Sequence, residues 1–411
     1  MSPEFQTGVN MSLKERIPII PVTELEQPAF CRDDEPLVVK SLAEEFAAPV
    51  RWQTIPAEYL HLDGVALADR IRLARDKLGD RVVILGHHYQ REEIIQFADV
   101  RGDSFKLSQY AASSASAEFI IFCGVHFMAE TAEVLSSPHQ KVILPNITAG
   151  CSMSDMAATD DVVDCWDDLE AILGENTVIP ITYMNSTAAI KALCGRNGGI
   201  VCTSSNAPAI MEWAFERGEK VLFLPDQHLG RNTAIKLGIP LGEMITWNPF
   251  KPLGGHTAED IAAAKVILWQ GHCSVHTRFT VQQIDKARDA HPDINVIVHP
   301  ECTMDVVASA DMDGSTEFII KSITEAPPGS KWAVGTEISL VNRLAKEHPD
   351  KLVYCLDSIV CPCSTMYRVH PAYLLWVMEG LLDNKVINEI PVDADISKHA
   401  RVALGRMLSV G

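Results

Sequence analysis

The chain has 411 residues, of which 47% are hydrophobic, with 11 cysteines and a formal net charge of −19 at pH 7. This charge argues against nucleic acid and anionic membranes as partners, and no apolar run reaches the roughly 18 residues that a membrane-spanning helix needs. The N-terminus lacks the layout of a signal peptide, so we expect a cytoplasmic protein. An odd number of cysteines, without the density of a disulfide scaffold, suits a reducing compartment where thiols serve metals.

The first 63 residues predict an extension without a domain of its own. Residues 1–10 (MSPEFQTGVN) precede a second methionine, Met11, and resemble an expression-vector remnant. Residues 11–63 are punctuated by proline and only weakly periodic, which indicates a segment that wraps the surface.

From residue 64 onward, strand-like and helix-like stretches alternate. The strand-like runs are RVVILG, AEFIIFCG, QKVILP, TVIPIT, GIVCT, KVLFLP, AKVILW, INVIVH, KWAVG and KLVYCL. Short runs rich in Val, Ile and Leu are typical of parallel strands buried on both faces. We therefore predict an α/β fold with three homologous three-layer α/β/α domains at residues 64–160, 161–279 and 280–365. A helical segment at 366–411 is expected to pack back on the first domain.

One pattern occurs three times: a buried strand, a polar motif at its end, a hydroxyl, and a cysteine that closes the copy. The copies carry His87, Tyr89, Ser104 and Cys151; Tyr183, Asn185, Ser204 and Cys273; and His299, Glu301, Thr316 and Cys361. The last residue of the motif and the hydroxyl lie 15 residues apart in the first and third copies and 19 apart in the second. Ligands of parallel sheets bind beyond the carboxyl ends of the strands, so the copies predict one central site where the three units meet.

Three converging thiolates favour an open iron–sulfur cluster. A structural zinc site takes four ligands, usually from paired C-x₂-C loops, and a [4Fe–4S] cluster normally takes four cysteines. With three cysteines, one iron keeps an open position and can act as a Lewis acid. The cysteines lie 122 and 88 residues apart, so the site forms only when the units pack together. The other seven cysteines apart from Cys363 are expected to be buried apolar side chains: Cys31, Cys123, Cys165, Cys194, Cys202, Cys302 and Cys355.

The hydroxyls and the strand-end side chains have both structural and chemical interpretations. Ser104, Ser204 and Thr316 lie where helices are predicted to begin, so they can cap those helices or help the helix N-termini to bind an anion. The acid–base candidates are His87, Tyr89, Tyr183, Asn185, His276, His299 and Glu301. A single histidine after a strand is more often a structural hydrogen-bonding group, but here the positions repeat. His88 is expected to point away from its neighbour His87.

Taken together, the motifs resemble the quinolinate synthase family over about residues 64–380. They are GHHYQ, RGDS, CGVHFMAET, AGCS, YMNSTAAIKA, CTSSNA, LPDQHLGR, HPEC, GST and CPxxxM, in order and with compatible spacing. The resemblance implies a pseudo-threefold arrangement of three α/β/α domains around a [4Fe–4S] cluster with three cysteine ligands. It also implies condensation of iminoaspartate with dihydroxyacetone phosphate to give quinolinate, phosphate and water for NAD biosynthesis. L-aspartate oxidase would supply the imine.

The resemblance also assigns roles to individual residues. It places the cluster ligands at Cys151, Cys273 and Cys361, and catalytic proton transfer at Glu301, Tyr89, His87 and His299. The substrate-binding positions are His87, Ser104, Tyr183, Asn185, Ser204, His276, His299, Glu301 and Thr316. The chain departs from the family pattern after the last ligand, where Cys363 is a second thiol and Tyr367 replaces a common Asn. Spacing to Met366 favours Cys361 over Cys363.

Two other classes of protein remain open from the residues alone. An aconitase-like iron–sulfur hydro-lyase also uses three cysteines, but it usually places two of them in a C-x₂-C pair. A solute-binding protein built of α/β units needs no cluster and normally carries an export signal. Iron and sulfide analysis of anaerobically purified protein separates the three classes.

Overall fold

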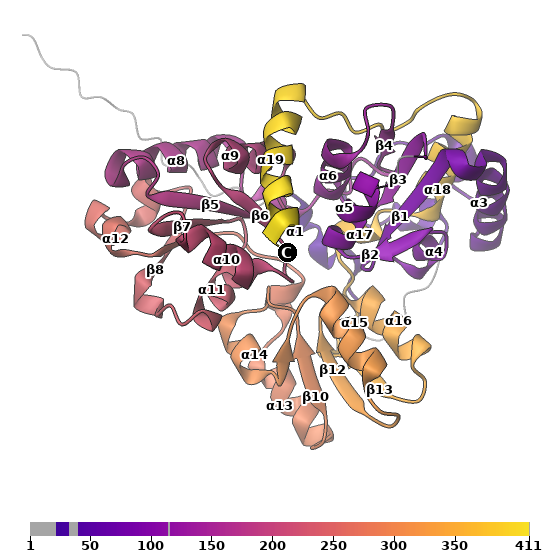
Figure 1. Ribbon diagram of the computed structural model, residues 1–411. Helices are drawn as coiled ribbons and strands as arrows, with labels where there is room; N and C mark the ends of the chain where they lie inside the picture. Colours follow the sequence, from indigo (N-terminus) through magenta and orange to yellow (C-terminus); the bar gives the residue numbers. More distant parts are fainter. Residues whose placement is uncertain (1–21, 33–39, 114–115, 411) are drawn as a thin grey trace, which may run out of the picture.

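Three parallel β-sheets, each flanked by helices, form the framework of the computed structural model (Figure 1). The structure describes residues 22–32, 40–113 and 116–410, so the predicted vector remnant at 1–10 lies outside it. The strands of the three sheets fall within the predicted ranges 64–160, 161–279 and 280–365. All ten predicted strands are present, and the fold class is α/β as expected.

The first unit combines a four-stranded sheet with helices on its two faces. Its elements are α3 (Gly64–Leu78), β1 (Val82–His87), α4 (Glu92–Ile95), β2 (Val100–Gly102), α5 (Ser104–Ser113), β3 (Phe119–Cys123), α6 (His126–Leu135), β4 (Lys141–Ile143) and α7 (Ser152–Asp155).

The second unit has five strands. Its elements are α8 (Thr159–Leu173), β5 (Val178–Tyr183), α9 (Ala188–Arg196), β6 (Ile200–Cys202), α10 (Ala207–Phe215), β7 (Lys220–Leu224), α11 (Gln227–Lys236), β8 (Met244–Trp247), α12 (Ala258–Ala263) and β9 (Val266–Trp269).

The third unit repeats the four-stranded arrangement. Its elements are α13 (Val281–Ala290), β10 (Asn295–Val298), α14 (Met304–Ser309), β11 (Met312–Asp313), α15 (Thr316–Glu325), β12 (Lys331–Gly335), α16 (Ile338–Glu347) and β13 (Leu352–Cys355). Sequence reasoning missed β2, β8 and β11, because short strands at sheet edges bury less apolar surface than central ones.

The sheets share one strand order, which explains the spacings seen in the sequence. The orders are β2-β1-β3-β4, β6-β5-β7-β9 with β8 added at the edge, and β11-β10-β12-β13. The first strand of each sheet is paired in register with the second, Leu85 with Val100, Ile181 with Ile200 and Ile297 with Met312. These offsets are 15, 19 and 15 residues, equal to the motif-to-hydroxyl spacings. The length of the first crossover therefore sets the sequence distance between the polar motif, which follows the first strand, and the hydroxyl, which follows the second strand at the same sheet edge.

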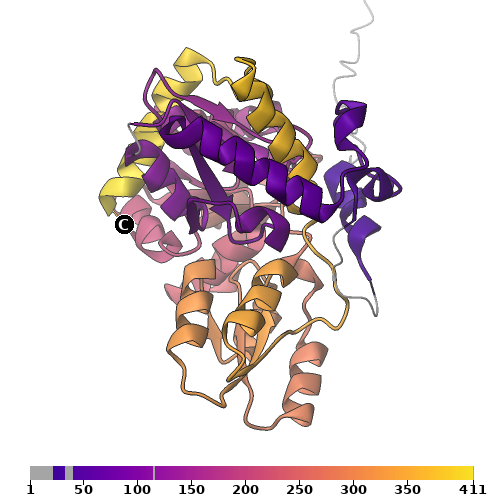
Figure 2. The same ribbon diagram turned by 90° about the vertical axis from the view of Figure 1, so that its right-hand side faces the viewer.

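Segments from both ends of the chain pack onto these units. The N-terminal elements are α1 (Val22–Leu25), η1 (Gln27–Phe30) and α2 (Leu42–Glu45), and the C-terminal ones are α17 (Ser364–Tyr367), α18 (Pro371–Leu382) and α19 (Ala394–Val410). Figure 2 shows α18 beside α3 of the first unit, as expected. The expectation for the rest of this segment was wrong: α19 lies chiefly against α9 and β6 of the second unit (Figure 1). Within the described residues, every helix is too short or too polar to cross a bilayer.

The contact between α9 and α19 depends on a glycine. A Cβ added at Gly195 would lie 2.0 Å from the backbone oxygen of His399, whereas one added at Gly405 on α19 meets nothing within 4 Å. Only a residue without a side chain allows the two helix backbones to approach this closely.

We expect Gly195→Ala to lower the free energy of unfolding by about 1–3 kcal/mol through overpacking. The control, Gly405→Ala, should be neutral or slightly stabilising because alanine is the better helix former. Chemical denaturation of the two variants provides the measurement. Equal stability of both variants would contradict the close packing of α9 on α19.

A buried lysine supports the loop that follows β5. Lys191 on α9 is fully buried, and its Nζ donates to the backbone oxygen of Met184 at 2.8 Å and also to that of Ser186. Burial lowers the pKa of this ammonium from 10.5 to about 7. The side chain thus holds the turn that carries Tyr183 and Asn185.

This burial predicts a pH dependence of stability. In the unfolded chain Lys191 keeps its proton up to about pH 10.5, whereas the folded chain releases it near pH 7. Folding therefore releases a proton between these values, so stability rises with pH across that window. Between pH 7 and 9 the stability of the wild type relative to Lys191→Met should increase by about 2 kcal/mol. The difference relative to Lys398→Met, at an exposed site on α19, should stay constant.

Candidate functional site

One cavity collects the predicted site residues from all three units. It holds roughly 690 Å³ of space between the atoms, part of it open to solvent. Every residue proposed for the site except Cys361 lines it, namely His87, Tyr89, Ser104, Cys151, Tyr183, Asn185, Ser204, Cys273, His276, His299, Glu301 and Thr316. The remaining lining is largely apolar and includes four methionines, Met128, Met153, Met184 and Met366.

A buried carboxylate, Glu301, lies at the centre of the polar network. It follows β10 and is 2% exposed. Its Oε1 accepts a hydrogen bond from the Tyr183 hydroxyl at 2.7 Å, and its Oε2 lies 2.7 Å from Nδ1 of His276. Burial alone would raise the pKa of Glu301, but His299, His276 and the Tyr183 hydroxyl outweigh it and hold the pKa below its usual range. Glu301 is therefore ionised, and its two oxygens face the Tyr183 hydroxyl and the His276 ring.

The network continues through a threonine to the first unit. Nε2 of His276 lies 3.1 Å from Oγ1 of Thr336, which in turn lies 2.8 Å from the Tyr89 hydroxyl. Thr316 donates to the same hydroxyl at 3.1 Å. Proton-carrying groups of all three units therefore form one continuous chain of hydrogen bonds, which is the arrangement that relayed proton transfer needs.

The histidines of the cavity are buried and differ in orientation. Burial lowers the pKa of His299 to about 3, so this imidazole is neutral at physiological pH, and its ring stacks on that of His276 with centroids 4.4 Å apart. Burial also lowers the pKa of His87 well below its usual value. His88 points away as expected, with its Nε2 3.0 Å from Glu317.

Helix N-termini surround the hydroxyls, whereas neighbouring residues supply the caps. Asp103 accepts from the backbone N–H of Lys106 in α5, and Ser315 caps α15 through the N–H of Phe318. Thr316 is the first residue of α15, and Ser104 is the first residue of α5. No lysine or arginine lines the part of the cavity that the structure describes. Anion recognition there depends on hydroxyls, amides and the positive ends of helices.

Three cysteine sulfurs share one local geometry. Cys151, Cys273 and Cys363 all line the cavity. Each sulfur accepts a hydrogen bond from the backbone N–H three residues later, at Ser154, His276 and Met366 respectively. Burial raises the pKa of all three thiols, and Cys363 raises those of Cys151 and Cys273 further. A metal cation between the three thiols would favour their thiolate forms, and backbone hydrogen bonds to sulfur are typical of iron–sulfur sites.

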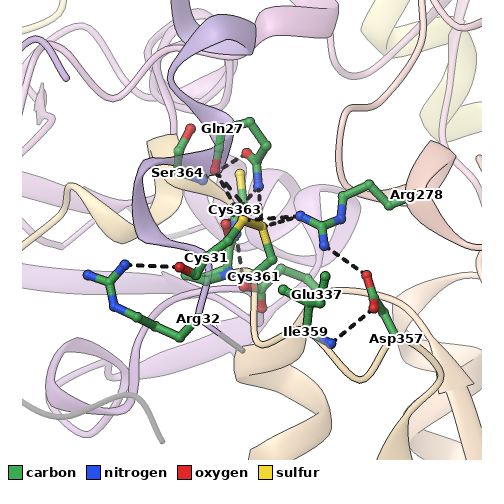
Figure 3. The surroundings of a disulfide bond; sticks show 11 residues. Gln27, Cys31, Arg32, Arg278, Glu337, Asp357, Ile359, Cys361, Cys363 and Ser364 are labelled. Carbon is green, nitrogen blue, oxygen red and sulfur yellow. Dashed lines mark hydrogen bonds and ion pairs between the residues drawn. A yellow bond between two sulfur atoms is a disulfide. The ribbon is translucent and has the colours of Figure 1, made fainter. Parts of the chain in front are cut away.

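Cys361, the predicted third ligand, is not among the described residues that line the cavity. Its sulfur is instead joined to Cys31 in a disulfide (Figure 3). Pro362 separates the two thiols and directs them to different surroundings, because its fixed φ prevents their side chains from converging. The expectation that Cys31 is a buried apolar side chain was wrong. Among the other cysteines, five are buried and Cys355 is half-buried.

The donor set therefore fits a metal centre, with Cys363 in place of Cys361. Three thiols match the ligand number of an open [4Fe–4S] cluster. Each of them lies in a loop that belongs to a different unit or directly follows it. A smaller group, Cys273, His276 and Glu301, also brings one ligand atom each within 4.8 Å of one another. This group shares Cys273 with the first, so a single ion there would compete with a cluster.

Sequence reasoning missed two residues of the site. Thr336 follows β12 in the run VGTE and links His276 to Tyr89; its position directly after a strand was the available signal. Cys363 was considered and set aside on spacing to Met366. Its position before a short helix, as for Cys151, would have favoured it.

Comparisons with known proteins place the chain in one family. Residues 69–409 match the family model described as quinolinate synthetase A protein. The chain is 59% identical over 360 residues to the quinolinate synthase of Corynebacterium glutamicum, covering 88% of this chain and 91% of that protein. It is 55% identical over 352 residues to that of a Nocardioides species, covering 84% and 89%, and 52% identical over 360 residues to that of a Geobacillus species, covering 88% and 98%. The chain belongs to the quinolinate synthase family.

Proposed function

We propose that the protein condenses iminoaspartate with dihydroxyacetone phosphate to give quinolinate, phosphate and water. The observation that carries this proposal is the convergence of three thiols and one proton relay on a single cavity between three α/β units. Family membership favours this reaction over that of an aconitase-like hydro-lyase. The common strand order of the three sheets supports a pseudo-threefold arrangement around the site.

A [4Fe–4S] cluster held by Cys151, Cys273 and Cys363 would supply an iron without a protein ligand, and hence a Lewis acid for a substrate oxygen or nitrogen. The three sulfurs take their places before short helical turns, where backbone N–H groups stabilise the thiolate form. The apolar methionine side chains around them limit the access of water.

The side chains of the cavity divide into anion-binding and proton-carrying groups. Ser104, Ser204 and Thr316, together with the N-termini of α5 and α15, would hold carboxylates and phosphate in reactive alignment. Glu301 would take up protons directly or through His276, and Tyr89 would return them from the other end of the relay. Neutral His87 and His299 can donate or accept a hydrogen bond without carrying charge into an apolar site.

The substrates also define the partner reaction. An imine of aspartate hydrolyses readily in water, so the protein depends on an enzyme that oxidises the amine of L-aspartate, an L-aspartate oxidase. Contact between the two enzymes would be transient.

The proposal predicts the composition and the activity of the purified protein. Anaerobically reconstituted wild type should contain about four irons and four sulfides per chain, and it should form quinolinate from the two substrates, as measured by chromatography. Cys363→Ala should hold less than a full cluster and be inactive, whereas Cys361→Ala should keep the cluster and most activity. If the cluster survives in Cys363→Ala and is lost in Cys361→Ala, Cys361 is the third ligand, as the spacing in the sequence predicts. Tightly bound zinc without sulfide would overturn the cluster.

A second prediction concerns Glu301. Glu301→Gln keeps the size of the side chain but removes the charge that accepts protons, so turnover should fall by at least about 10²-fold while the cluster spectrum stays unchanged. Glu133→Gln, at a half-buried carboxylate on α6, is the matched control and should keep normal turnover. Near-normal turnover by Glu301→Gln would remove this residue from the mechanism.

A further inference from the structure

The segment Val22–Arg32, here called the N-terminal clasp, touches the loops of all three proposed ligands. Thr23 donates to Asp155 of α7, the short helix that follows Cys151, at 3.5 Å. Glu24 lies 2.8 Å from Nε2 of His272, the residue before Cys273. Gln27 contacts both neighbours of Cys363. The family match begins at residue 69, so the clasp lies outside it.

The clasp is tied most firmly to the loop that carries Cys363. Arg32 and Val360 exchange two backbone hydrogen bonds of 2.8 and 2.9 Å, as in an antiparallel strand pair. Glu26 forms a buried ion pair with Arg368, and Cys31 is disulfide-bonded to Cys361. These contacts hold the loop on both sides of Cys363, at residues 360–361 and at residue 368.

Gln27 is the residue of the clasp that bonds to the backbone on both sides of the proposed ligand. Its side chain is buried, with the residue only 5% exposed. Its Nε2 donates to the backbone oxygen of Pro362 at 2.8 Å, and its Oε1 accepts from the backbone N–H of Ser364 at 3.0 Å (Figure 3). Ser364 opens α17, where a backbone N–H has no partner within the helix. One carboxamide therefore satisfies the peptide groups immediately before and after Cys363.

A carboxylate completes the support from the opposite side. Glu337, which caps α16, accepts the backbone N–H of Cys363 at 3.2 Å. The Pro362–Cys363 peptide is thus held at its oxygen by Gln27 and at its nitrogen by Glu337. With the peptide fixed, the Cys363 sulfur has few directions in which to point.

We propose that the N-terminal clasp is part of the metal centre, and that Gln27 is a positioning residue that holds Cys363 in place as a ligand. This inference rests on the proposed role of Cys363. Without Gln27, the loop retains its chain path through the other contacts, but the sulfur samples more positions and the cluster is released faster. Residues that orient metal ligands from outside typically contribute 10- to 100-fold to metal affinity or activity.

The chain offers a matched control for Gln27. Gln140 is also buried, and it likewise makes two hydrogen bonds to backbone, to the oxygen of Ala117 and from the N–H of Ser137, each 2.9 Å. It lies in the first unit before β4 and belongs neither to the cavity nor to a ligand loop. Gln27→Met and Gln140→Met each remove at least two buried hydrogen bonds to backbone groups, so both should lower the thermal midpoint.

The test measures iron release from anaerobically reconstituted full-length protein to an excess of a ferrous chelator. Tris(2-carboxyethyl)phosphine keeps Cys31 and Cys361 reduced, so that only non-covalent contacts hold the loop. Gln27→Met should release iron about 10 times faster than wild type or more, and Gln140→Met should stay within about twofold of it. Gln27→Glu, which retains an acceptor for the Ser364 N–H, should fall between. Wild-type rates in Gln27→Met, or equal acceleration in Gln140→Met, overturn the proposal.

Two further arms keep the result unambiguous. If Gln27→Met does not fold, Gln27→Glu against Gln140→Glu carries the same comparison, and equal rates in that pair overturn the proposal. Cys363→Ala, prepared in parallel, tests the assumption beneath it. If Cys363→Ala still holds a full cluster, Cys363 is not a ligand, and the proposed role of Gln27 is ruled out with it. If Cys363→Ala loses the cluster but Gln27→Met releases iron at the wild-type rate, Cys363 remains a ligand and only the positioning role of Gln27 is ruled out.

Discussion

The carboxyl edges of three parallel sheets face a common cavity, and this constraint places nearly every group of the site. In each sheet the first strand ends at the cavity with a polar motif, and the crossover that follows brings a hydroxyl to the same edge. Parallel strands allow no other arrangement, because side chains that follow the strands and N-termini of the connecting helices all emerge at that edge. The three units therefore need only pack with these edges inward for the site to form.

The polar network adds a requirement of its own to this packing. A buried carboxylate is costly unless its oxygens accept hydrogen bonds. Glu301 of the third unit has a partner for each oxygen, the Tyr183 hydroxyl of the second unit and Nδ1 of His276. Thr336 then extends the chain of hydrogen bonds to Tyr89 of the first unit. Since a half-satisfied network is worse than an apolar contact, the same bonds that would carry protons also specify how the units sit together.

The segments outside the sheets contribute to the site from a distance in sequence. The N-terminal clasp reaches the loops of Cys151, Cys273 and Cys363, and α19 closes over α9, whose Lys191 holds the turn after β5. The units thus form the walls of the cavity, while the two ends of the chain fix the loops that line it. For that reason, a change that loosens one of these end segments should also alter the geometry of the proposed ligands.

The sequence by itself determined the α/β class, the ten main strands and the threefold recurrence of strand, polar motif, hydroxyl and cysteine. It also named thirteen candidate site residues, twelve of which line one cavity. It did so because these features follow from local periodicity and from the rule that strand ends meet at one sheet edge. Only the tertiary structure shows that Cys363 lines the cavity whereas Cys361 does not, since two thiols two residues apart have the same local environment in sequence. The two thiols have different surroundings because contacts from distant residues hold the peptide between them in one orientation. These residues are Cys31, Gln27 and Glu337, between 24 and 336 residues away in sequence. The link through Thr336 and the packing of α19 on the second unit were decided in the same way, by contacts between segments that no local pattern relates.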